Sequence, residues 1–348
     1  MSYKMLRNCL NCSVLALGLL LLQTATAQSS ITGLDQQLTA SQKQLPRDYV
    51  LQVWKKDDTL AYQKIAGELT AKSAIQIGAS SSWMTAAMVM ILVDEGKLSL
   101  DDKITKWLPE FEKYGKNYIT IRHCLTHMTG IKGYGSAVGS LFKKKKFMNL
   151  EEEVNSYAAR EIQTIPGTEF RFSEIGPAIA GRVLEVVTKK RFDQLVKQRL
   201  LTPLKMRSTG FSNATGGPVS PSDGATSTAD DYMKFLIMLL NKGTYHGRRV
   251  LSEEAVAELL RVQVEPSMMK EVPKTAQGFS YTLGSWIPAD NRGTVFIAPG
   301  FDGTWPIIDT CRGYAFLLIA KEQAKDEKGK TILDLKAATD AGFSGSCD

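Results

Sequence analysis

The stretch from Ala79 to Asp102, ASSSWMTAAMVMILVDEGKLSLDD, decides the fold. Within it, residues 83–93 are nearly all apolar, contain few β-branched side chains and have the length of a helix. Serines stand immediately before this run, and serine is a preferred residue at helix N-termini. Gly96 follows the run and is expected to end the helix. The stretch therefore predicts a helix that is buried on all sides, with serine N-cap chemistry at its start.

Strand patterns lie on both sides of this helix, towards the two ends of the chain. Tyr49–Trp54 and about Leu60–Ile65 flank a polar turn and predict a hairpin. Later strands are expected at Phe279–Ile287, Thr294–Ile297, Thr304–Asp309 and Tyr314–Ala320, before a last helix at about 327–341. Between them, helical patterns occupy roughly 151–161, 176–189, 191–200, 228–241 and 252–261. The simplest packing is one mainly antiparallel sheet built from both ends, with the helical middle as a second lobe.

The first 27 residues have the organisation of a signal peptide. Lys4 and Arg7 precede an apolar run from Val14 to Leu22, and the run is followed by Ala25-Thr26-Ala27. This small-residue ending predicts cleavage before Gln28. The run is shorter than the roughly 20 residues that span a bilayer, and no later stretch is apolar enough to cross a membrane. We therefore expect a periplasmic or secreted protein without an integral membrane segment, an uncleaved N-terminal anchor being the alternative.

The mature chain, residues 28–348, is expected to be one domain. Its sheet lobe would comprise about 48–75 and 277–341, and its helical lobe about 80–270. Three cysteines remain after the leader: Cys124, Cys311 and Cys347. Because an exported protein can form disulfides, Cys311–Cys347 is the pairing to test, whereas Cys124 lies in an apolar pattern and is expected to be a buried thiol.

Composition argues against several classes of function. The chain has 43 Lys+Arg and 36 Asp+Glu, and its net charge of +7 becomes +5 once the two basic residues of the leader are removed. This charge is mild, and the basic cluster Lys143–Lys146 lacks interleaved aromatic residues, so no nucleic-acid partner is expected. With three histidines and no C-x-x-C after residue 27, neither a metal site nor a cofactor is expected.

Short motifs in a fixed order resemble the serine hydrolases of the β-lactamase group. This group includes class C β-lactamases, D-alanyl-D-alanine carboxypeptidases and related esterases. The motifs are Thr85-Ala86-Ala87, Leu92–Asp102, Ile119–Gly130, Pro166-Gly167-Thr168, Pro203–Met206, Ala225–Asp231, Gly243–Arg248 and Leu251-Ser252. The resemblance covers about residues 30–322. It implies an α/β fold of the α+β type, like that of β-lactamases and penicillin-binding proteins, with a mainly antiparallel sheet, a helical lobe and a cleft between them.

The chemistry of that group needs three sequence signatures. In S-x-x-K, a serine at the start of a buried helix attacks a carbonyl, and a lysine one turn later shares the proton transfers with the tyrosine of Y-x-N. Backbone N–H groups hold the oxyanion. The third signature, K/H-x-G, supplies a cation or imidazole that meets a substrate carboxylate. The group also keeps a histidine at the position of His127 without a metal, so we expect a structural role for it although His123 lies four residues before it.

Carried over position by position, the three signatures are degraded in this sequence. The nucleophile lies six residues before Thr85 and the lysine three before it, which gives Ala79 and Ser82. The second signature becomes Phe172-Ser173-Glu174, and the third becomes Ala298-Pro299-Gly300. The family-equivalent positions are Ala79, Ser82, Phe172, Glu174, Ala298 and Gly300. Ala79 lacks the nucleophilic oxygen, and Ser82 lacks the basic nitrogen. Phe172 lacks the phenol hydroxyl, and Ala298 lacks the cation or imidazole.

These losses favour a non-catalytic protein that binds a ligand or acts as a scaffold. A cell-wall peptide, an acyl ligand or a protein partner in the cleft between the lobes are the candidates. The alternative is a hydrolase, of esterase, peptidase or β-lactamase type, that uses a relocated serine. Ser80, Ser81 and Ser82 are the candidate nucleophiles, and Glu174 is the possible base. Residues 79 and 82 share one helix face, so Ser82 is expected to face the cleft, as a helix-capping serine or as a hydrogen-bond partner of Glu174.

Overall fold

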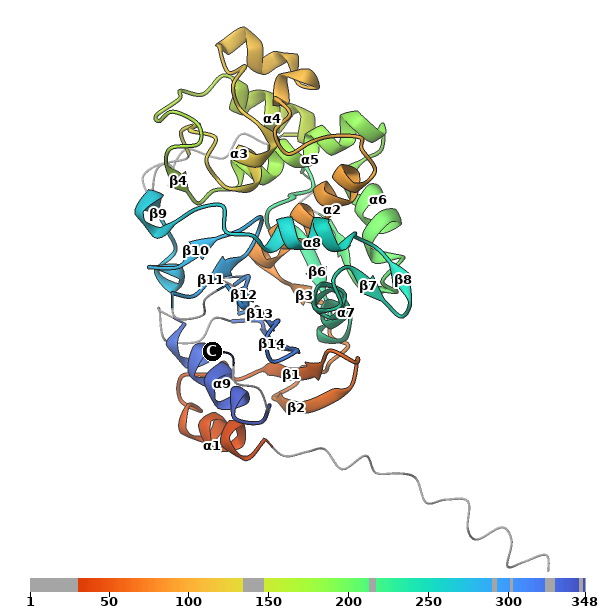
Figure 1. The fold of residues 1–348 in the computed structure, drawn as a ribbon, viewed down its shortest axis with the longest axis vertical. Coiled ribbons are helices and arrows are strands. Elements are labelled where there is room, and N and C mark those ends of the chain that lie inside the picture. Colours follow the sequence, from red (N-terminus) through yellow and green to blue (C-terminus); the bar gives the residue numbers. More distant parts are fainter. Residues whose placement is uncertain are drawn as a thin grey trace, which may run out of the picture. The chain divides into compact units, whose positions relative to one another are not determined.

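The largest sheet joins strands from both ends of the chain. A computed structural model describes residues 31–133, 147–212, 217–289, 293–300, 303–322, 329–343 and 347 (Figure 1). Its seven strands follow the order β10–β11–β12–β13–β14–β1–β2, and all neighbours are antiparallel. They are β1 (Tyr49–Lys55), β2 (Leu60–Ala66), β10 (Ser280–Tyr281), β11 (Trp286–Ile287), β12 (Val295–Ile297), β13 (Trp305–Asp309) and β14 (Tyr314–Ala320). The expected antiparallel sheet is therefore confirmed.

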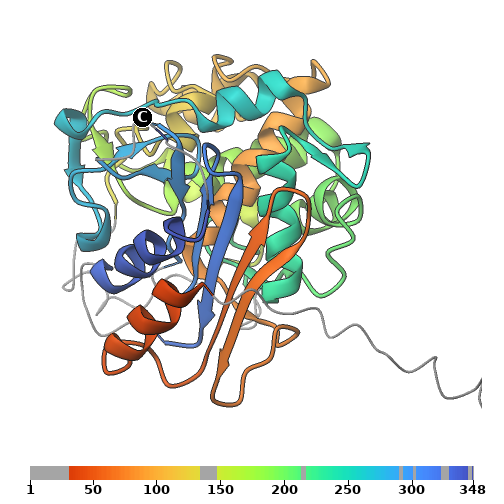
Figure 2. The ribbon, with the colours of Figure 1, turned by 60° about the horizontal axis from the view of Figure 1, so that its bottom comes forward.

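Strand β14 is buried along its whole length because helices cover both faces of the sheet. Its side chains alternate between two apolar clusters, so that Leu317 and Ile319 join the cluster of α7 whereas Phe316 and Leu318 join that of α1 and α9. Figure 2 shows α1 and α9 side by side against the sheet. A strand covered on both faces needs a continuous apolar sequence, which is why its bounds could be predicted so well.

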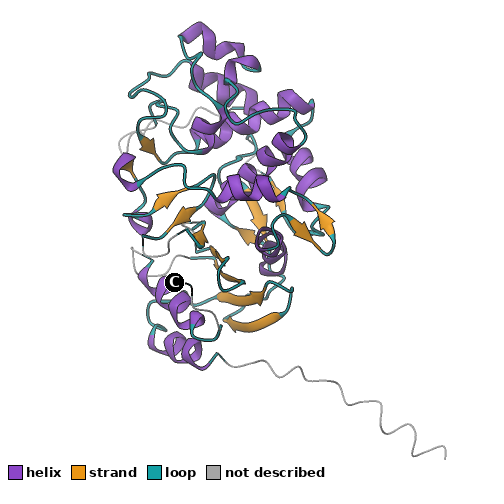
Figure 3. Cartoon of the chain, viewed as in Figure 1, coloured by secondary structure: helices purple, strands orange, loops and turns teal. Residues whose placement is uncertain are grey.

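The helices occupy most of the middle of the chain. Their bounds are α1 (Thr32–Ala40), α2 (Ser81–Asp94), α3 (Ile121–Leu125), α4 (Leu150–Ala158), α5 (Ile175–Thr188), α6 (Phe192–Val196), α7 (Ala229–Leu240), α8 (Glu253–Leu260) and α9 (Lys330–Asp340). Helices α3, α4 and α5 lie at the end of the molecule farthest from α1 and α9 (Figures 1 and 3). No helix of the described residues is long and apolar enough to cross a membrane.

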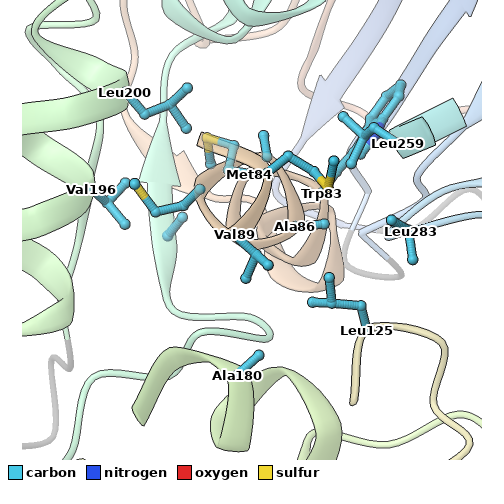
Figure 4. Close-up of a cluster of buried hydrophobic side chains, with 14 of the residues drawn as sticks. Trp83, Met84, Ala86, Val89, Leu125, Ala180, Val196, Leu200, Leu259 and Leu283 are labelled. Carbon is cyan, nitrogen blue, oxygen red and sulfur yellow. The ribbon is translucent and has the colours of Figure 1, made fainter. Parts of the chain in front are cut away.

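Helix α2 runs through the centre of the helical part, and every residue from Ser81 to Leu92 is buried. Side chains from α5, α6, α8 and the turns beside them surround it, among them Ala180, Val196 and Leu259 (Figure 4). The expected all-round burial of this helix is confirmed. Burial on every side also explains why its sequence lacks the polar stripe of a surface helix.

Three smaller sheets complete the fold. Strands β3 (Ile75–Gln76), β6 (Ala225–Ser227) and β5 (Gly210–Phe211) form one of them. Strands β4 (Phe170–Arg171) and β9 (Met269–Glu271) pair in parallel, and β7 (Thr244–Tyr245) pairs with β8 (Arg248–Arg249). The first of these sheets is important for the site, because β3 and β6 lead into the segments that touch the start of α2.

Three differences from the sequence-based expectations concern the large sheet and the helices. The strand expected at Phe279–Ile287 is two strands, β10 and β11, separated by a turn at Gly284 whose φ is +90°. Helix α1 was not expected, because only Leu34 and Leu38 of its nine residues are buried. Helix α7 belongs in sequence to the helical lobe, yet it packs on β14, β1 and β13. The break between β10 and β11, the formation of α1 and the position of α7 all depend on tertiary packing. A local sequence pattern does not predict such packing.

A buried charge network fastens α9 to the hairpin of β13 and β14. Asp309 is fully buried, and its carboxylate accepts from Lys336 Nζ at 2.9 Å and from Arg312 Nη1 at 3.2 Å. Lys336 also donates to Asp340 at 2.9 Å. The pairing that the sequence left open is present, because a disulfide between Cys311 and Cys347 joins the same hairpin to residue 347. Cys124 is a buried free thiol, as expected.

Candidate functional site

The start of α2 brings the nucleophile-equivalent position next to the third signature. A short 3-10 turn, Gly78–Ser80, leads from β3 into the helix. The Ala79 N–H donates to the carbonyl of Gly300 at 3.3 Å, so residues 79 and 300 are in direct backbone contact. Ala79 is partly exposed, whereas Ser80 and Ser81 are fully buried and Ser82 is 6% exposed. The carried-over positions of the first and third signatures therefore lie together in space.

All three serines at the start of α2 donate their hydroxyl protons to backbone carbonyls. Ser80 Oγ donates to Ala298 at 2.6 Å, and Ser81 Oγ donates to Gly78 at 2.6 Å. Ser82 Oγ donates to Ser222 at 2.9 Å, across a separation of 140 residues. A nucleophilic hydroxyl needs a base within hydrogen-bond reach, and a neutral peptide carbonyl cannot take a proton.

These contacts correct two expectations about the serines. Ser80 is the N-cap residue of α2, but its backbone is helical and its side chain makes no capping hydrogen bond. Ser82 neither caps the helix nor donates to Glu174, because its single proton goes to Ser222. The side chains point outward from the helix end to neighbouring segments, so they connect α2 with other elements instead of capping it.

The residues that receive these contacts were missed by sequence reasoning. The segment 220–225 is held by Ser82 and by Thr85, whose Oγ1 donates to the carbonyl of Pro221 at 2.6 Å. Ser81 Oγ also accepts from the Ala225 N–H at 3.1 Å. The partners are backbone atoms in a Gly/Ser/Pro-rich loop, and no side-chain pattern in the sequence reports such partners.

The third signature keeps its glycine for a packing reason. After β12, the Ala298 N–H donates to Pro306 at 3.1 Å and the Gly300 N–H donates to Thr304 at 2.7 Å. A Cβ on Gly300 would lie 2.3 Å from the carbonyl oxygen of Ile77, well inside van der Waals contact. Glycine is therefore required where this segment crosses the turn before α2. Ala298 is buried and puts a methyl group where the signature has a cation or imidazole.

The second signature sits at the start of α5, beside a cluster of aromatic rings. The Phe172 N–H donates to Glu271 at 2.9 Å, and its ring lies 4.7 Å from that of His127 and 5.8 Å from that of Trp286. Glu174 is the N-cap residue of α5 and is half-buried. No described residue gives its carboxylate a hydrogen bond or an ion pair.

His127 holds this aromatic cluster together as a neutral imidazole. Its Nδ1 accepts from the Ser173 N–H at 3.4 Å, so the proton is assigned to Nε2, which lies 3.0 Å from the hydroxyl of Tyr281. Burial lowers the pKa of His127 to about 4. The loop after Tyr281 reaches the start of α2, because a Cβ on Gly284 would lie 2.9 Å from Cα of Trp83. Residues 281–284 thus connect the second signature with the first.

We expect this buried imidazole to make the protein less stable in mild acid. The unfolded chain binds a proton on His127 near pH 6.5, whereas the folded protein does so only near pH 4. His127 therefore imposes no proton-linked penalty on folding above pH 6.5. As the pH falls from 6.5 to 4, its protonation in the unfolded chain lowers the free energy of unfolding by about 3 kcal/mol. Denaturant unfolding at several pH values measures this, with His127→Gln, which cannot titrate, giving a flatter profile. Equal slopes for the two proteins would contradict the assignment.

The two histidines of the pair at 123 and 127 lie in different local structures. His123 lies in α3, where its Nδ1 accepts from the Thr120 N–H at 3.4 Å as part of a capping box. His127 follows the helix end with a φ of +53°, so the two rings do not share a helix face. Within the described ranges, no group of three or more His, Cys, Asp or Glu side chains is arranged to hold a metal ion.

The fold and the order of segments around α2 define a protein of the β-lactamase and penicillin-binding-protein type. The family profile described as Beta-lactamase matches residues 47–340, and the chain belongs to that family. "Protein Rv1367c" of Mycobacterium tuberculosis is 29% identical over 328 residues, covering 74% of this chain and 81% of that protein. "Esterase EstB" of Burkholderia gladioli is 26% identical over 176 residues, covering 47% of this chain and 44% of that protein.

Solved structures share the same fold at low sequence identity. A "putative beta-lactamase from Bacteroides dorei" superposes with a TM-score of 0.76 at 24% identity and covers 89% of this chain and 98% of that chain. The "octameric penicillin-binding protein homologue from Pyrococcus abyssi" superposes with a TM-score of 0.71 at 19% identity. The superposition covers 89% of this chain and 76% of that chain. The fold implied by the sequence motifs is therefore confirmed.

Proposed function

We propose that the mature chain is an exported, non-catalytic member of the beta-lactamase family that binds a ligand at the family's active-site position. The observation that carries this proposal is the state of the three hydroxyls at the start of α2. Each of them donates to a backbone carbonyl, and the nucleophile position itself is Ala79. The protein keeps the framework of the family while its serines hold neighbouring segments in place.

The reaction of the family requires groups that these positions do not provide. Acyl transfer needs a nucleophile, a base to take its proton and donors for the oxyanion. Ser82 carries no basic nitrogen, and Phe172 carries no hydroxyl. The N–H of Ala79, the donor closest to an oxyanion formed at that position, donates to Gly300 instead. Removing the members of such a coupled unit together leaves only the effects of binding.

Export is the part of the proposal that rests mainly on the sequence. Residues 1–27 have the basic start, apolar run and small-residue ending of a signal peptide. The Cys311–Cys347 disulfide supports an oxidising location, since disulfides persist in the periplasm and outside the cell. A cell-wall peptide, an acyl compound and a protein partner remain the ligand classes proposed.

Covalent labelling tests whether the protein is inactive. The purified protein is incubated with benzylpenicillin and with a fluorophosphonate, and its intact mass is recorded beside that of a class C β-lactamase treated identically. We expect adducts on the reference enzyme and none on this protein, because none of its three hydroxyls at the start of α2 faces a base. Hydrolysis of p-nitrophenyl butyrate is expected to match the rate in buffer.

A matched variant separates a relocated nucleophile from incidental labelling. In Ser82→Ala, the most exposed of the three hydroxyls is removed, and its melting temperature shows whether the protein stays folded. An adduct that maps to Ser80, Ser81 or Ser82 of the original protein would overturn the proposal and support the relocated-serine hydrolase. An adduct that disappears in folded Ser82→Ala would name Ser82 as the nucleophile.

A further inference from the structure

We infer that a cavity between α1 and the start of β1 binds an amphipathic anion, with an apolar body and one carboxylate. The cavity has a volume of about 630 Å³, within the range of about 300–1,000 Å³ that is typical of small-molecule sites. Described residues of α1, the loop after it, β1 and β2 line it, together with Glu322 after β14.

This cavity lies on the opposite face of the sheet from the start of α2. Tyr49, which lines the cavity, belongs to the apolar cluster of α1 and α9, whereas Trp83 of α2 belongs to the other cluster. Figure 2 shows α1 against the sheet on that first face. The inference therefore concerns a further site and does not depend on the proposed function.

The hollow lies where a large side chain of β1 has small neighbours in the adjacent strands. Tyr49 is paired with Ala66 of β2 on one side and with Ala320 of β14 on the other. Cross-strand partners share a face of the sheet, so two methyl groups flank the phenol ring. Leu38 of α1 and Leu45 of the following loop are buried and also line the cavity. The floor is thus an apolar surface that suits the body of the ligand.

The floor also carries a hydroxyl group that has no partner among the described residues. Tyr49 is 7% exposed, and no described side chain or backbone group forms a hydrogen bond with its phenol. Burial raises the pKa of Tyr49, so the hydroxyl keeps its proton at neutral pH and is available as a donor. The nearby hydroxyl of Tyr62 donates to Asp35 at 2.5 Å. A buried hydroxyl without an acceptor is unfavourable, and a ligand carboxylate would supply one.

The charged side chains that line the cavity carry a positive excess. Lys43, Arg47 and Lys64 are exposed at its rim, and none of them has an ion pair or a side-chain hydrogen bond with a described residue. The two carboxylates at the rim are those of Asp35 and Glu322, and the first already accepts a hydroxyl proton. One negative charge on the ligand would balance this rim. Charge-assisted hydrogen bonds from these cations favour a carboxylate, and the same cations repel an ammonium group.

The test uses three compounds that share one alkyl chain and differ in charge. Octanoate is anionic, octan-1-ol is neutral and octylammonium is cationic at pH 7. Calorimetric titration of the full chain at about 0.15 M salt measures each affinity. We expect octanoate to bind about tenfold more tightly than octan-1-ol, and octylammonium to bind most weakly.

A pair of exposed cations is replaced to assign the charge preference. Combined Arg47→Gln and Lys64→Gln substitutions are expected to bring the affinity for octanoate within about threefold of that for octan-1-ol. Both side chains are exposed, so the fold is expected to be kept. Lys55→Gln is the matched control, because Lys55 is an exposed lysine at the other end of β1 and does not line this cavity. It is expected to leave all three affinities unchanged.

Two variants of the floor locate the binding. Ala66→Phe fills the space beside Tyr49 and is expected to weaken binding of octanoate and octan-1-ol about tenfold. Tyr49→Phe removes only the hydroxyl and is expected to weaken octanoate about threefold while leaving octan-1-ol unchanged. The melting temperature of each variant shows that it is folded.

Four results would overturn the inference. These are no binding of octanoate, equal affinities for octanoate and octylammonium, a preference that survives the loss of Arg47 and Lys64, and unchanged octanoate binding in folded Ala66→Phe. Each of them would leave the proposed function at the start of α2 standing, because that site shares no residue with this cavity.

Discussion

Replacing Asp309 by alanine is expected to lower the free energy of unfolding by about 3–5 kcal/mol, because it leaves two cations without their buried partner. Asp309 is fully buried and receives hydrogen bonds from Lys336 Nζ and from the guanidinium and backbone N–H of Arg312. Lys336 is itself 6% exposed, so water cannot replace the lost carboxylate. Denaturant unfolding of the variant beside the original protein measures the loss.

Two further variants show which part of the interaction matters. Asp309→Asn keeps an acceptor for the Arg312 N–H and removes the charge, so it should lose less than Asp309→Ala. Asp334→Ala breaks the exposed Lys330–Asp334 pair on the same helix and is expected to cost far less, because exposed ion pairs contribute little. If Asp309→Ala were as mild as Asp334→Ala, the network would not be what holds α9 to the sheet.

Reduction of the Cys311–Cys347 disulfide is expected to cost about 3–4 kcal/mol. The bond closes a loop with a sequence separation of 36 residues, and opening it restores the conformational freedom of that loop in the unfolded chain. Unfolding in the presence and absence of a reductant measures the effect. Cys347→Ser should be as unstable as the reduced protein and should no longer respond to reductant. A response to reductant that persisted in Cys347→Ser would have to come from a different disulfide and would contradict this assignment.

The parts of the fold that were predictable are those in which a local pattern and the tertiary structure agree. Strand β14 is buried on both faces, and helix α2 is buried on all sides. Their sequences are therefore nearly continuous apolar runs. Helix α1 could not be anticipated, since it is held by packing against α9 at the other end of the chain. The break between β10 and β11 arises where Gly284 passes close to α2, a contact across about 200 residues of sequence.

The sequence spacing predicted which residues lie at the start of the buried helix, but it did not predict their hydrogen bonds. The spacing from Thr85 placed Ala79 and Ser82 at the start of a buried helix, and the structure puts Ala79 beside Gly300. The hydrogen bonds of the serines were not readable, because Ser80 and Ser82 bond to main-chain atoms 218 and 140 residues away. A hydroxyl in a sequence does not reveal whether its proton faces a base or a peptide carbonyl.

The contact between Ser82 and Ser222 also determines what single substitutions could do to the proposed non-catalytic protein. A change of Ala79 to serine alone would supply a hydroxyl without a base, and it would bring no catalytic gain. A change of Ser82 to lysine alone would give up the hydroxyl that binds the Ser222 carbonyl, again without a nucleophile to activate. Each single step is therefore neutral or harmful, and a gain appears only when several steps are combined.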